Sequence, residues 1–295
     1  MHVLKPVIHE TIWGGRRLCP TDGRAIGHLY SVVDGAVSNE LYDGSYADFH
    51  AYFEAVKDRC GLSGFSFYPY TAALVDAAEH LSIQVHPDDH AAKVLEHRPH
   101  GKNESWYFLE APESGWIYNG CTAESTTKVR TLLDRGMIES VTAHLPVKKG
   151  DYVYVQAGTL HALTAGSLVF EIEENCPLTY RFYDYERRDS AGKKRELHIE
   201  QALSVLKPGL QSAAVKENGS LIEERMYSLR LIRGAELYQN DSDTLETLTL
   251  LSEAEADGVL YPGGAAIVLE PGERVGLNHA DVMMVRPNTG FSLQQ

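Results

Sequence analysis

Short segments of alternating apolar and polar residues, separated by glycine and proline, recur along most of this chain of 295 residues. An alternation of period two is typical of β-strands, because successive side chains point to opposite faces of a sheet. Proline ends such runs because it cannot donate a backbone hydrogen bond, and glycine permits tight turns. Clear examples are LSIQVH (81–86), ESWYFLEA (104–111) and GDYVYV (150–155). The sequence therefore predicts a mainly β protein.

A few segments have apolar residues at helical spacing instead, and we expect helices there. They are SYADFHAYFEAVKDRC (45–60), TAESTTKVRTLLDRG (122–136) and RELHIEQALSVL (195–206). Gly136 is a natural end for the second, and Pro208 follows the third. We expect the first two at the periphery, and DDHAAKVLEHR (88–98) as a further short helix or turn.

The chain is long enough for one large domain or two smaller ones. After Pro208 the segment GLQSAAVKENGS (209–220) is polar and loose, so we interpret it as a linker. The predicted domains are residues 1–208, with helical insertions, and a smaller β domain over 222–295 with turns rich in proline and glycine. In the second, His279 stands alone without a trio of metal ligands, so we expect a packing or dimerisation module.

Composition excludes several classes of function. The net charge of −14 argues against nucleic-acid binding, which depends on clustered lysine and arginine. No apolar stretch approaches the roughly 18 residues of a membrane span, and the first residues lack the apolar run of a signal peptide. The four scattered cysteines form no Cys-x-x-Cys pair, which argues against a thiolate zinc site and fits a reducing compartment. We expect a cytoplasmic protein that binds neither nucleic acid nor membrane.

One group of polar residues has the composition of a metal site. Alternation places Ser82, Gln84 and His86 on one strand face, and Glu104 begins a return strand that would lie across from His86 as an antiparallel pair. His161 follows a turn and begins a further strand. Imidazole, carboxylate and amide oxygen suit zinc or a similar divalent ion, with positions left open for substrate. Such mixed ligands have no tight spacing motif, so ordinary polar surface is the alternative interpretation.

Four motifs in this region resemble, in order and spacing, those of type I phosphomannose isomerase (mannose-6-phosphate isomerase) of the short bacterial class. They are LSIQVHPDD, GKNESWYFLEA, GDYVYVQAGTLHAL and NCPLTYRFYDYERRD. The resemblance runs from LKPVIHETIWGGRRL through RELHIEQAL. It implies a cupin jelly-roll barrel with peripheral helices and a zinc ion inside, followed by a second, smaller, degenerate cupin-like β domain.

The resemblance also implies an activity and its site. The expected reaction interconverts mannose 6-phosphate and fructose 6-phosphate through an enediol, with one zinc ion per chain. The family's zinc ligands correspond to Gln84, His86, Glu104 and His161. The partner is a phosphorylated hexose, and the chain is expected to be a monomer or a homodimer.

The remaining site residues follow from the same resemblance. The proton-transfer base corresponds to Lys102 or Glu171, and the sequence does not choose between them. Arginine suits phosphate because its planar donor fork binds two oxygens. Phosphate contacts correspond to Ser82, Arg181 and Arg187, with Arg181 also among the catalytic candidates. Arg187 lies in a basic cluster that can equally be a solvated surface.

Two positions depart from the family pattern and keep other functions open. Ala73 stands where many members carry a lysine, and Gln156 stands where the cupin pattern has proline. The first alternative is therefore a sugar-binding cupin with altered or lost activity. The second is another metal-cupin enzyme such as an iron oxygenase, which Gln84 disfavours because iron oxygenases tend to use two histidines and a carboxylate.

Overall fold

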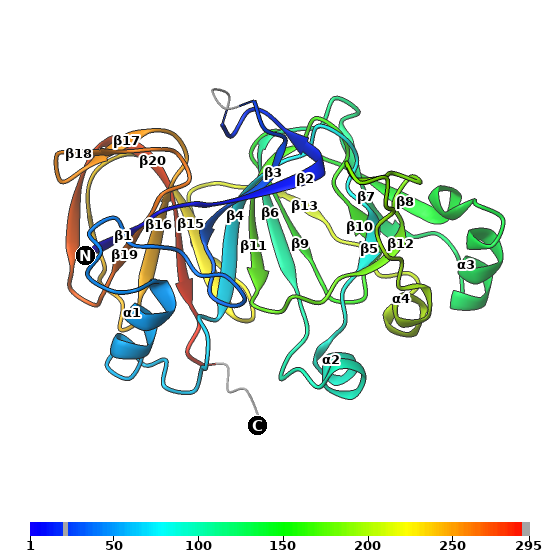
Figure 1. Cartoon of the computed structure of the whole chain (residues 1–295), viewed down its shortest axis with the longest axis horizontal. Coiled ribbons are helices and arrows are strands. Elements are labelled where there is room, and N and C mark those ends of the chain that lie inside the picture. The colour runs from blue at the N-terminus through cyan, green and yellow to red at the C-terminus, as the bar shows by residue number, and fades with distance from the viewer. Residues whose placement is uncertain (20–22, 291–295) are drawn as a thin grey trace. The chain divides into compact units, whose positions relative to one another are not determined.

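The computed structural model describes residues 1–19 and 23–290, and antiparallel β-sheet dominates its regular structure, which confirms the predicted mainly β class (Figure 1). The described residues group into two compact units. We call them the 75–216 unit, formed by Glu10–His28 and Val75–Lys216, and the 217–290 unit, formed by Met1–His9, Leu29–Leu74 and the described residues from Glu217 onward.

This grouping differs from the predicted division at residue 208. Residues 1–9 and 29–74 join the C-terminal residues, because strand β1 (His2–Leu4) pairs with β19 (Ala266–Leu269) and the Tyr70 hydroxyl hydrogen-bonds to Thr247. The end of the 75–216 unit at Lys216 lies inside the predicted linker. That linker also contains a short strand, β13 (Ala214–Lys216), paired with β9 (Asp151–Val155). The assignment of chemistry to one domain and packing to the other stays a prediction.

Two antiparallel groups of strands form the 75–216 unit. The first has the order β13, β9, β6 (Glu104–Glu110) and β11 (Leu168–Glu174). The second is a five-stranded sheet with the order β12 (Tyr180–Tyr183), β5 (Ile83–Val85), β10 (His161–Ala162), β7 (Trp116–Cys121) and β8 (Thr142–Pro146). Strands β2 (Val7–Gly15), β3 (Ile26–Val32) and β4 (Tyr70–Asp76) each contain residues of both units.

The predicted helices are confirmed, each shorter than the segment that indicated it. They are α1 (Phe49–Val56), α2 (Asp89–Glu96), α3 (Thr126–Leu133) and α4 (Ile199–Val205), with a 3₁₀ turn η1 (Ile138–Val141) after α3. The side chains of Asp48, Asp88 and Ser125 accept hydrogen bonds from the first turns of α1, α2 and α3 and so fix where those helices begin. Each of α2 and α3 buries only one residue, so both are peripheral. Helix α1 buries Phe49, Tyr52, Phe53 and Val56, so the expectation that it lies at the periphery is corrected.

No helix in the described ranges combines the length and apolar character that crossing a membrane requires.

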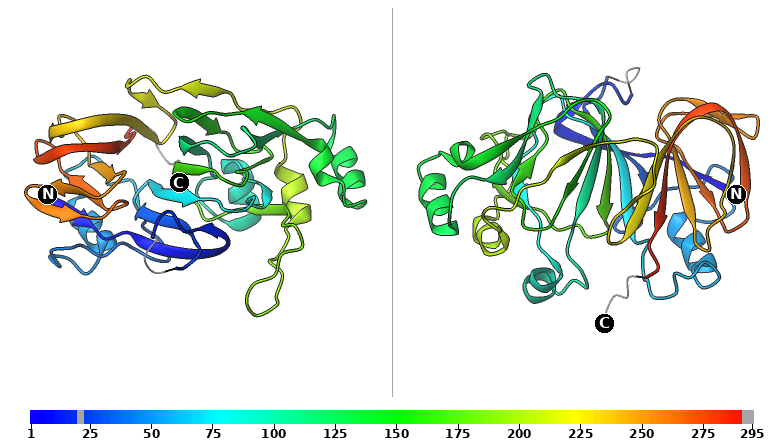
Figure 2. Two further views of the ribbon diagram at one scale, coloured as in Figure 1. Left: turned by 90° about the horizontal axis from the view of Figure 1, so that it is seen from above. Right: turned by 180° about the vertical axis from the view of Figure 1, so that it is seen from behind.

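The 217–290 unit is built on a sheet with the order β1, β19, β16 (Glu246–Leu250), β20 (Arg274–Pro287), β15 (Tyr227–Gln239) and β14 (Ile222–Glu223). A hairpin of β17 (Ala254–Ala256) and β18 (Val259–Tyr261) joins it through β20 (Figure 2). Its core is apolar and includes Leu248, Ile267, Val282 and Met284. Burial of these side chains is the main stabilising contribution within this unit.

One buried ion pair in the 75–216 unit connects distant segments. The carboxylate of Asp76 accepts hydrogen bonds from Nε of Arg17 at 2.8 Å and from the backbone N–H of Arg17 at 2.8 Å. The same guanidinium donates to the carbonyl of Ser167 at 2.9 Å and to Glu110 at 2.6 Å. The Asp76 side chain is 1% exposed and that of Glu110 is 53% exposed, so only the first is removed from water.

We predict that Asp76→Asn lowers the free energy of unfolding by about 2–3 kcal/mol, because the amide keeps the volume but faces the arginine with a donor where an acceptor stood. Glu110→Gln, which changes the exposed partner of the same guanidinium, should cost less than about 1 kcal/mol. Urea unfolding followed by circular dichroism measures both. Equal losses for the two variants would contradict the importance of the buried pair.

Candidate metal centre

A row of polar side chains crosses the five-stranded sheet. Gln84 of β5 pairs with Arg181 of β12 on one side and with His161 of β10 on the other, and His161 pairs in turn with Asn119 of β7. Directly opposed residues of neighbouring strands project from the same face. Ser82 lies beside this row, since its hydroxyl donates to Oε1 of Gln84 at 3.1 Å. The predicted shared face of Ser82 and Gln84 is therefore confirmed.

The other group of strands presents charged side chains. Glu104 of β6 is paired with Glu173 of β11, and Trp106 of β6 is paired with Glu171 of β11. Lys102 lies two residues before β6 and is buried. Four of these five residues, all except Trp106, carry an ionisable group, whereas the row on the five-stranded sheet is mostly uncharged.

The two sets meet at Glu104. Its Oε2 lies 3.0 Å from Nε2 of His86, and its Oε1 lies 3.2 Å from Nε2 of His161. All three side chains are 1% exposed. The prediction that Glu104 and His86 form an antiparallel pair is wrong, because β6 pairs with β9 and β11 while β5 pairs with β10 and β12. They meet as side chains of different sheets.

Backbone carbonyls orient both imidazoles. Nδ1 of His86 lies 2.9 Å from the carbonyl oxygen of Leu178, and Nδ1 of His161 lies 2.8 Å from that of Thr159. A proton on Nδ1 donates to each carbonyl, which leaves Nε2 with a free electron pair directed at Glu104. Burial lowers the pKa of His86 to about 4, so its imidazole is neutral at neutral pH. Neutral imidazole is the form that binds metal.

Two of the converging atoms are not hydrogen-bonded. Among the described residues, Nε2 of His86 and Oε1 of Glu104 are buried without a hydrogen-bond partner. Buried polar atoms are almost always paired, because desolvation without compensation is costly. One ligand atom from each of His86, Glu104 and His161 lies within 4.8 Å of the others, a spacing that a metal ion can bridge. The donor set, two nitrogens and a carboxylate, is one that zinc accepts.

Lys102 carries a stable positive charge beside this cluster. Its Nζ lies 3.5 Å from Oε2 of Glu104 and is ion-paired with Glu173. Burial acts to lower the pKa of Lys102, but the charges of Glu173, Glu104 and Glu171 outweigh it and raise that pKa. Burial likewise opposes ionisation of Glu104, yet its pKa lies well below the usual range, and the adjacent ammonium of Lys102 is the charge that favours the carboxylate. Lys102 is therefore an ammonium and Glu104 a carboxylate.

The surroundings of Glu171, in contrast to those of Glu104, favour the neutral carboxyl group over the carboxylate. Its Oε1 accepts a hydrogen bond from the indole Nε1 of Trp106 at 2.8 Å, and its Oε2 lies 3.7 Å from Nε2 of His28. Burial, with the nearby charges of Glu173 and Glu104, raises the pKa of Glu171 well above its ordinary value. The group of Glu104, Glu171 and Glu173 also has metal-like spacing, but two of its three members, Glu104 and Glu173, are already paired with the ammonium of Lys102.

The two predicted phosphate arginines differ in how their donors are used. Arg187 donates to the carbonyl of His80 at 2.7 Å and to Oδ1 of Asp184 at 2.5 Å. Arg181 lies in the row beside Gln84, and its buried Nε has no partner among the described residues. Arg181 is therefore the arginine with a donor to offer, and a phosphate role for Arg187 stays a prediction.

Two residues of this region have no role in the sequence-based predictions. Asn119, fully buried, accepts a hydrogen bond from the backbone N–H of Ser212 at 2.7 Å and so ties the segment before β13 to the row. Trp106 lies in the predicted strand ESWYFLEA, but its contact with Glu171 is not predicted. For Asn119 the sequence shows only a polar residue on a strand, and for Trp106 it shows only the period-two alternation. Neither signal identifies the residue that the side chain contacts.

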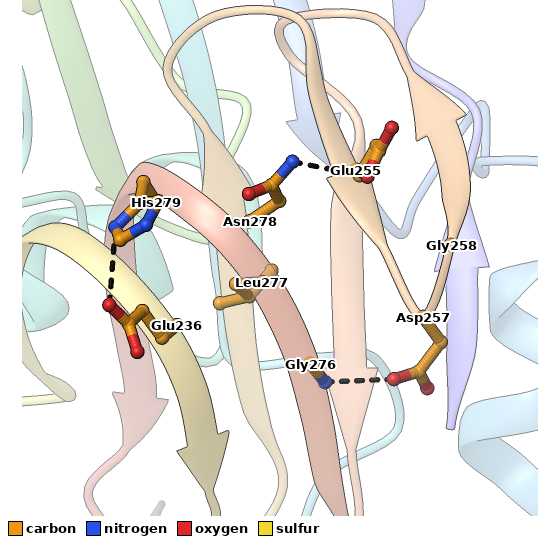
Figure 3. Close-up of a pocket in the computed structure, with 8 residues that line it drawn as sticks. All are labelled: Glu236, Glu255, Asp257, Gly258, Gly276, Leu277, Asn278 and His279. Carbon is orange, nitrogen blue, oxygen red and sulfur yellow. Dashed lines mark hydrogen bonds and ion pairs between the residues drawn. The ribbon is translucent and has the colours of Figure 1, made fainter.

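The 217–290 unit also holds an imidazole beside a carboxylate. Nδ1 of His279 lies 3.4 Å from Oε1 of Glu236 (Figure 3), and no group with metal-like spacing in the part of the chain that the structure describes includes this imidazole. Glu255 and Asp257 line the same hollow, where they accept hydrogen bonds from the Asn278 side chain and the backbone of Gly276. The side chains of His279 and Glu236 are 69% and 74% exposed, so water screens this pair.

Comparisons with known proteins agree with this geometry. The chain is 36% identical over 217 residues to the mannose-6-phosphate isomerase of Streptococcus mutans, a match that covers 70% of this chain and 67% of that relative. No protein-family profile matches the chain.

Solved structures match over nearly the whole chain. The crystal structure of the mannose 6-phosphate isomerase from Bacillus subtilis superposes with a TM-score of 0.82 at 26% identity, covering 97% of this chain and 98% of that one. A zinc-bound mannose 6-phosphate isomerase shares the fold with a TM-score of 0.65 at 13% identity, over 97% and 99% of the two chains. The predicted cupin fold class is confirmed.

Proposed function

This chain belongs to the mannose-6-phosphate isomerase family, and we propose that it interconverts mannose 6-phosphate and fructose 6-phosphate with one zinc ion per chain. The observation that supports this proposal most is the convergence of His86, Glu104 and His161 from two sheets, with two of the ligand atoms buried and not hydrogen-bonded. A cation at the substrate oxygens would stabilise the negative charge that develops when a proton moves between adjacent carbons, and these residues fit one.

Gln84 is the proposed fourth ligand. Its Nε2 lies 3.4 Å from Nε2 of His161, and a half-turn of the amide exchanges that nitrogen with Oε1. The exchange would direct an oxygen toward the cluster while the neighbouring Ser82 hydroxyl rotates to suit. A zinc ion bound here would supply Lewis-acid polarisation of the sugar oxygens. Unlike His86, Glu104 and His161, Gln84 is partly exposed, so we place the open side of the centre there.

We propose Glu171, rather than Lys102, as the group that moves the proton between C1 and C2. Lys102 is an ammonium held by Glu104 and Glu173, so it has no free electron pair with which to accept a proton. Its charge instead stabilises the negative charge that develops on the enediol oxygens. Glu171 has a raised pKa, and a carboxyl group with raised proton affinity exchanges protons near neutral pH more effectively than an ordinary one.

Arg181 is the proposed phosphate contact. It is half-buried, adjoins Gln84 in the row, and has an unpaired donor, whereas the described donors of Arg187 are used by Asp184 and a backbone carbonyl. Charge-assisted hydrogen bonds from a guanidinium to phosphate are among the stronger polar contacts in proteins. Ser82 stays a predicted phosphate contact, although its hydroxyl now donates to Gln84.

The alternative of a sugar-binding protein with lost activity rests on Ala73. This residue is buried in β4, a strand whose seven residues are all buried. Because Lys102 and Arg181 already bring two positive charges to the candidate centre, we favour the active isomerase. An iron oxygenase remains the other alternative and would be revealed by metal analysis.

The state of the cysteines bears on the cellular location of the chain. All four cysteines lie in the described residues and are free, which is consistent with a reducing compartment. A cytoplasmic location, and a monomer or homodimer as the active form, stay predictions.

We predict that chelator-treated protein loses turnover of mannose 6-phosphate and regains it with zinc, and that unphosphorylated mannose is a poor substrate. His86→Ala and His161→Ala should each hold less than about a tenth of the zinc of the unchanged protein, because three mixed ligands cannot retain the ion as four do. A coupled isomerase assay and elemental analysis measure these effects, with exposed His90→Ala as the matched control. Full zinc content in either site variant would contradict the centre.

We predict that Glu171→Gln lowers kcat by about 10²–10⁴-fold, because it removes the proposed proton-transfer group while keeping shape and leaving the zinc ligands in place. KM and zinc content should change little. The exposed Glu113→Gln is the control and should retain full activity. A kcat within about threefold of the unchanged enzyme would exclude Glu171 as this group and return Lys102 to consideration.

We predict that Arg181→Ala raises KM for mannose 6-phosphate by at least about tenfold, the loss expected for one charge-assisted phosphate contact. Turnover of unphosphorylated mannose, measured at high concentration, should be unaffected by the change. Exposed Arg188→Ala controls for the general loss of positive charge. Equal effects on the phosphorylated and unphosphorylated sugars would refute a phosphate role.

A further inference from the structure

Trp106 contacts both a proposed zinc ligand and the proposed proton-transfer group. Its indole ring lies against the imidazole of His161, with ring centroids 5.6 Å apart and planes at 66°. Its Nε1 donates a hydrogen bond to Oε1 of Glu171 at 2.8 Å. Trp106 and Glu171 are also directly opposed in the β6–β11 pairing, so both side chains project from the same face.

The indole is held more firmly than most hydrogen-bond donors. Trp106 is 1% exposed, and its bulk is packed among buried neighbours, including His161. An indole offers one donor and no acceptor, so the direction of the bond is unambiguous. A rigid donor of this kind fixes the carboxyl group that accepts from it, in the way that outer hydrogen bonds orient metal ligands.

The contacts of Glu171 divide between its two oxygens. Oε1 accepts from Trp106 at 2.8 Å, whereas Oε2 lies 3.7 Å from Nε2 of His28. The indole therefore occupies Oε1, which leaves Oε2 as the oxygen to accept and return a proton. Without the indole N–H, the carboxyl group can rotate about its last side-chain bond, for which the torsional preference is weak.

We propose that Trp106 is a positioning residue that, through its N–H bond to Oε1, aims Oε2 of Glu171 at the sugar carbons. The inference rests on the proposed function. In the step that it supports, the C2–H bond of the aldose breaks and the proton moves to Oε2 of Glu171. The electron pair of that bond forms the C1–C2 double bond while the carbonyl pair moves to O1, which gives an enediolate. The hydroxyl proton of O2 then passes to O1, the C2 carbonyl forms, and the pair of the C1–C2 double bond takes the proton from Oε2 to C1, so the carboxyl group returns to its starting state and no co-reactant is consumed.

A purely structural Trp106 would have the same burial, so the test must separate the two roles. Trp106→Phe keeps an aromatic ring against His161 and removes the donor. We expect kcat to fall by about 10–100-fold with KM for mannose 6-phosphate and zinc content unchanged, since misplacing a reacting group costs rate rather than binding. Trp116→Phe, which alters a partly exposed tryptophan stacked on His144, is the matched control and should retain full activity.

The decisive measurement is a double-mutant cycle. If Trp106 acts through Glu171, adding Trp106→Phe to Glu171→Gln should change kcat by less than about threefold further, because the group to be positioned is already gone. If the two losses multiply instead, Trp106 acts independently of Glu171 and the inference is overturned. An unchanged kcat in the single Trp106→Phe variant overturns it as well.

A near-isosteric replacement covers the case in which Trp106→Phe fails to fold. Benzothienylalanine at position 106 keeps the bicyclic shape and replaces the N–H with sulfur, so packing is preserved and only the donor is lost. The same fall in kcat is expected, and an unchanged kcat would refute the positioning role. Absence of isomerase activity in the zinc-loaded unchanged protein would instead refute the proposed function itself, so the two failures are distinguishable.

Discussion

The carboxylate of Glu104 is the charge around which the 75–216 unit is arranged. An isolated buried carboxylate is strongly disfavoured, and it persists only when cations or hydrogen-bond donors compensate it. Lys102 does so from the same segment of chain, whereas His86 and His161 approach from the other sheet. Because those imidazoles donate through Nδ1 to backbone carbonyls, they turn electron pairs rather than protons toward Glu104. Three electron-pair donors thus converge without a proton between them, an arrangement that a divalent cation would satisfy.

The two sheets contribute different chemistry, and this division explains how one interior can serve several roles. The row from Arg181 to Asn119 offers neutral donors and acceptors with an arginine at one end. The opposing strands carry Glu171 and Glu173, whose burial raises their pKa values, near the ammonium of Lys102. In our proposal the cation sits where the two sets meet, the phosphate lies toward Arg181, and proton transfer occurs on the carboxylate side.

Period-two alternation was sufficient to predict the mainly β class and the common face of Ser82 and Gln84, because side-chain direction is a local property of a strand. It was insufficient for the partner of each strand. Glu104 and His86 were expected to be paired neighbours, but which sheet a strand joins depends on contacts between distant segments. The same limit hid the bond from Trp106 to Glu171, since nothing within ESWYFLEA indicates what its tryptophan faces. Arg187, in contrast, shows how a basic motif can be absorbed by nearby acceptors, here Asp184 and a backbone carbonyl.

Burial, more than residue type, separates a chemical centre from a surface contact in this chain. An imidazole and a carboxylate approach each other in both units, at 3.0 Å for His86 and Glu104 and at 3.4 Å for His279 and Glu236. The first pair is buried, so water cannot hydrogen-bond to the ligand atoms that lack a protein partner. A bound cation would therefore interact with those atoms with little screening by water. The second pair is open to water, which hydrates both groups and leaves little free energy for a ligand to gain. The same two residue types therefore favour metal binding only where the surrounding strands exclude water.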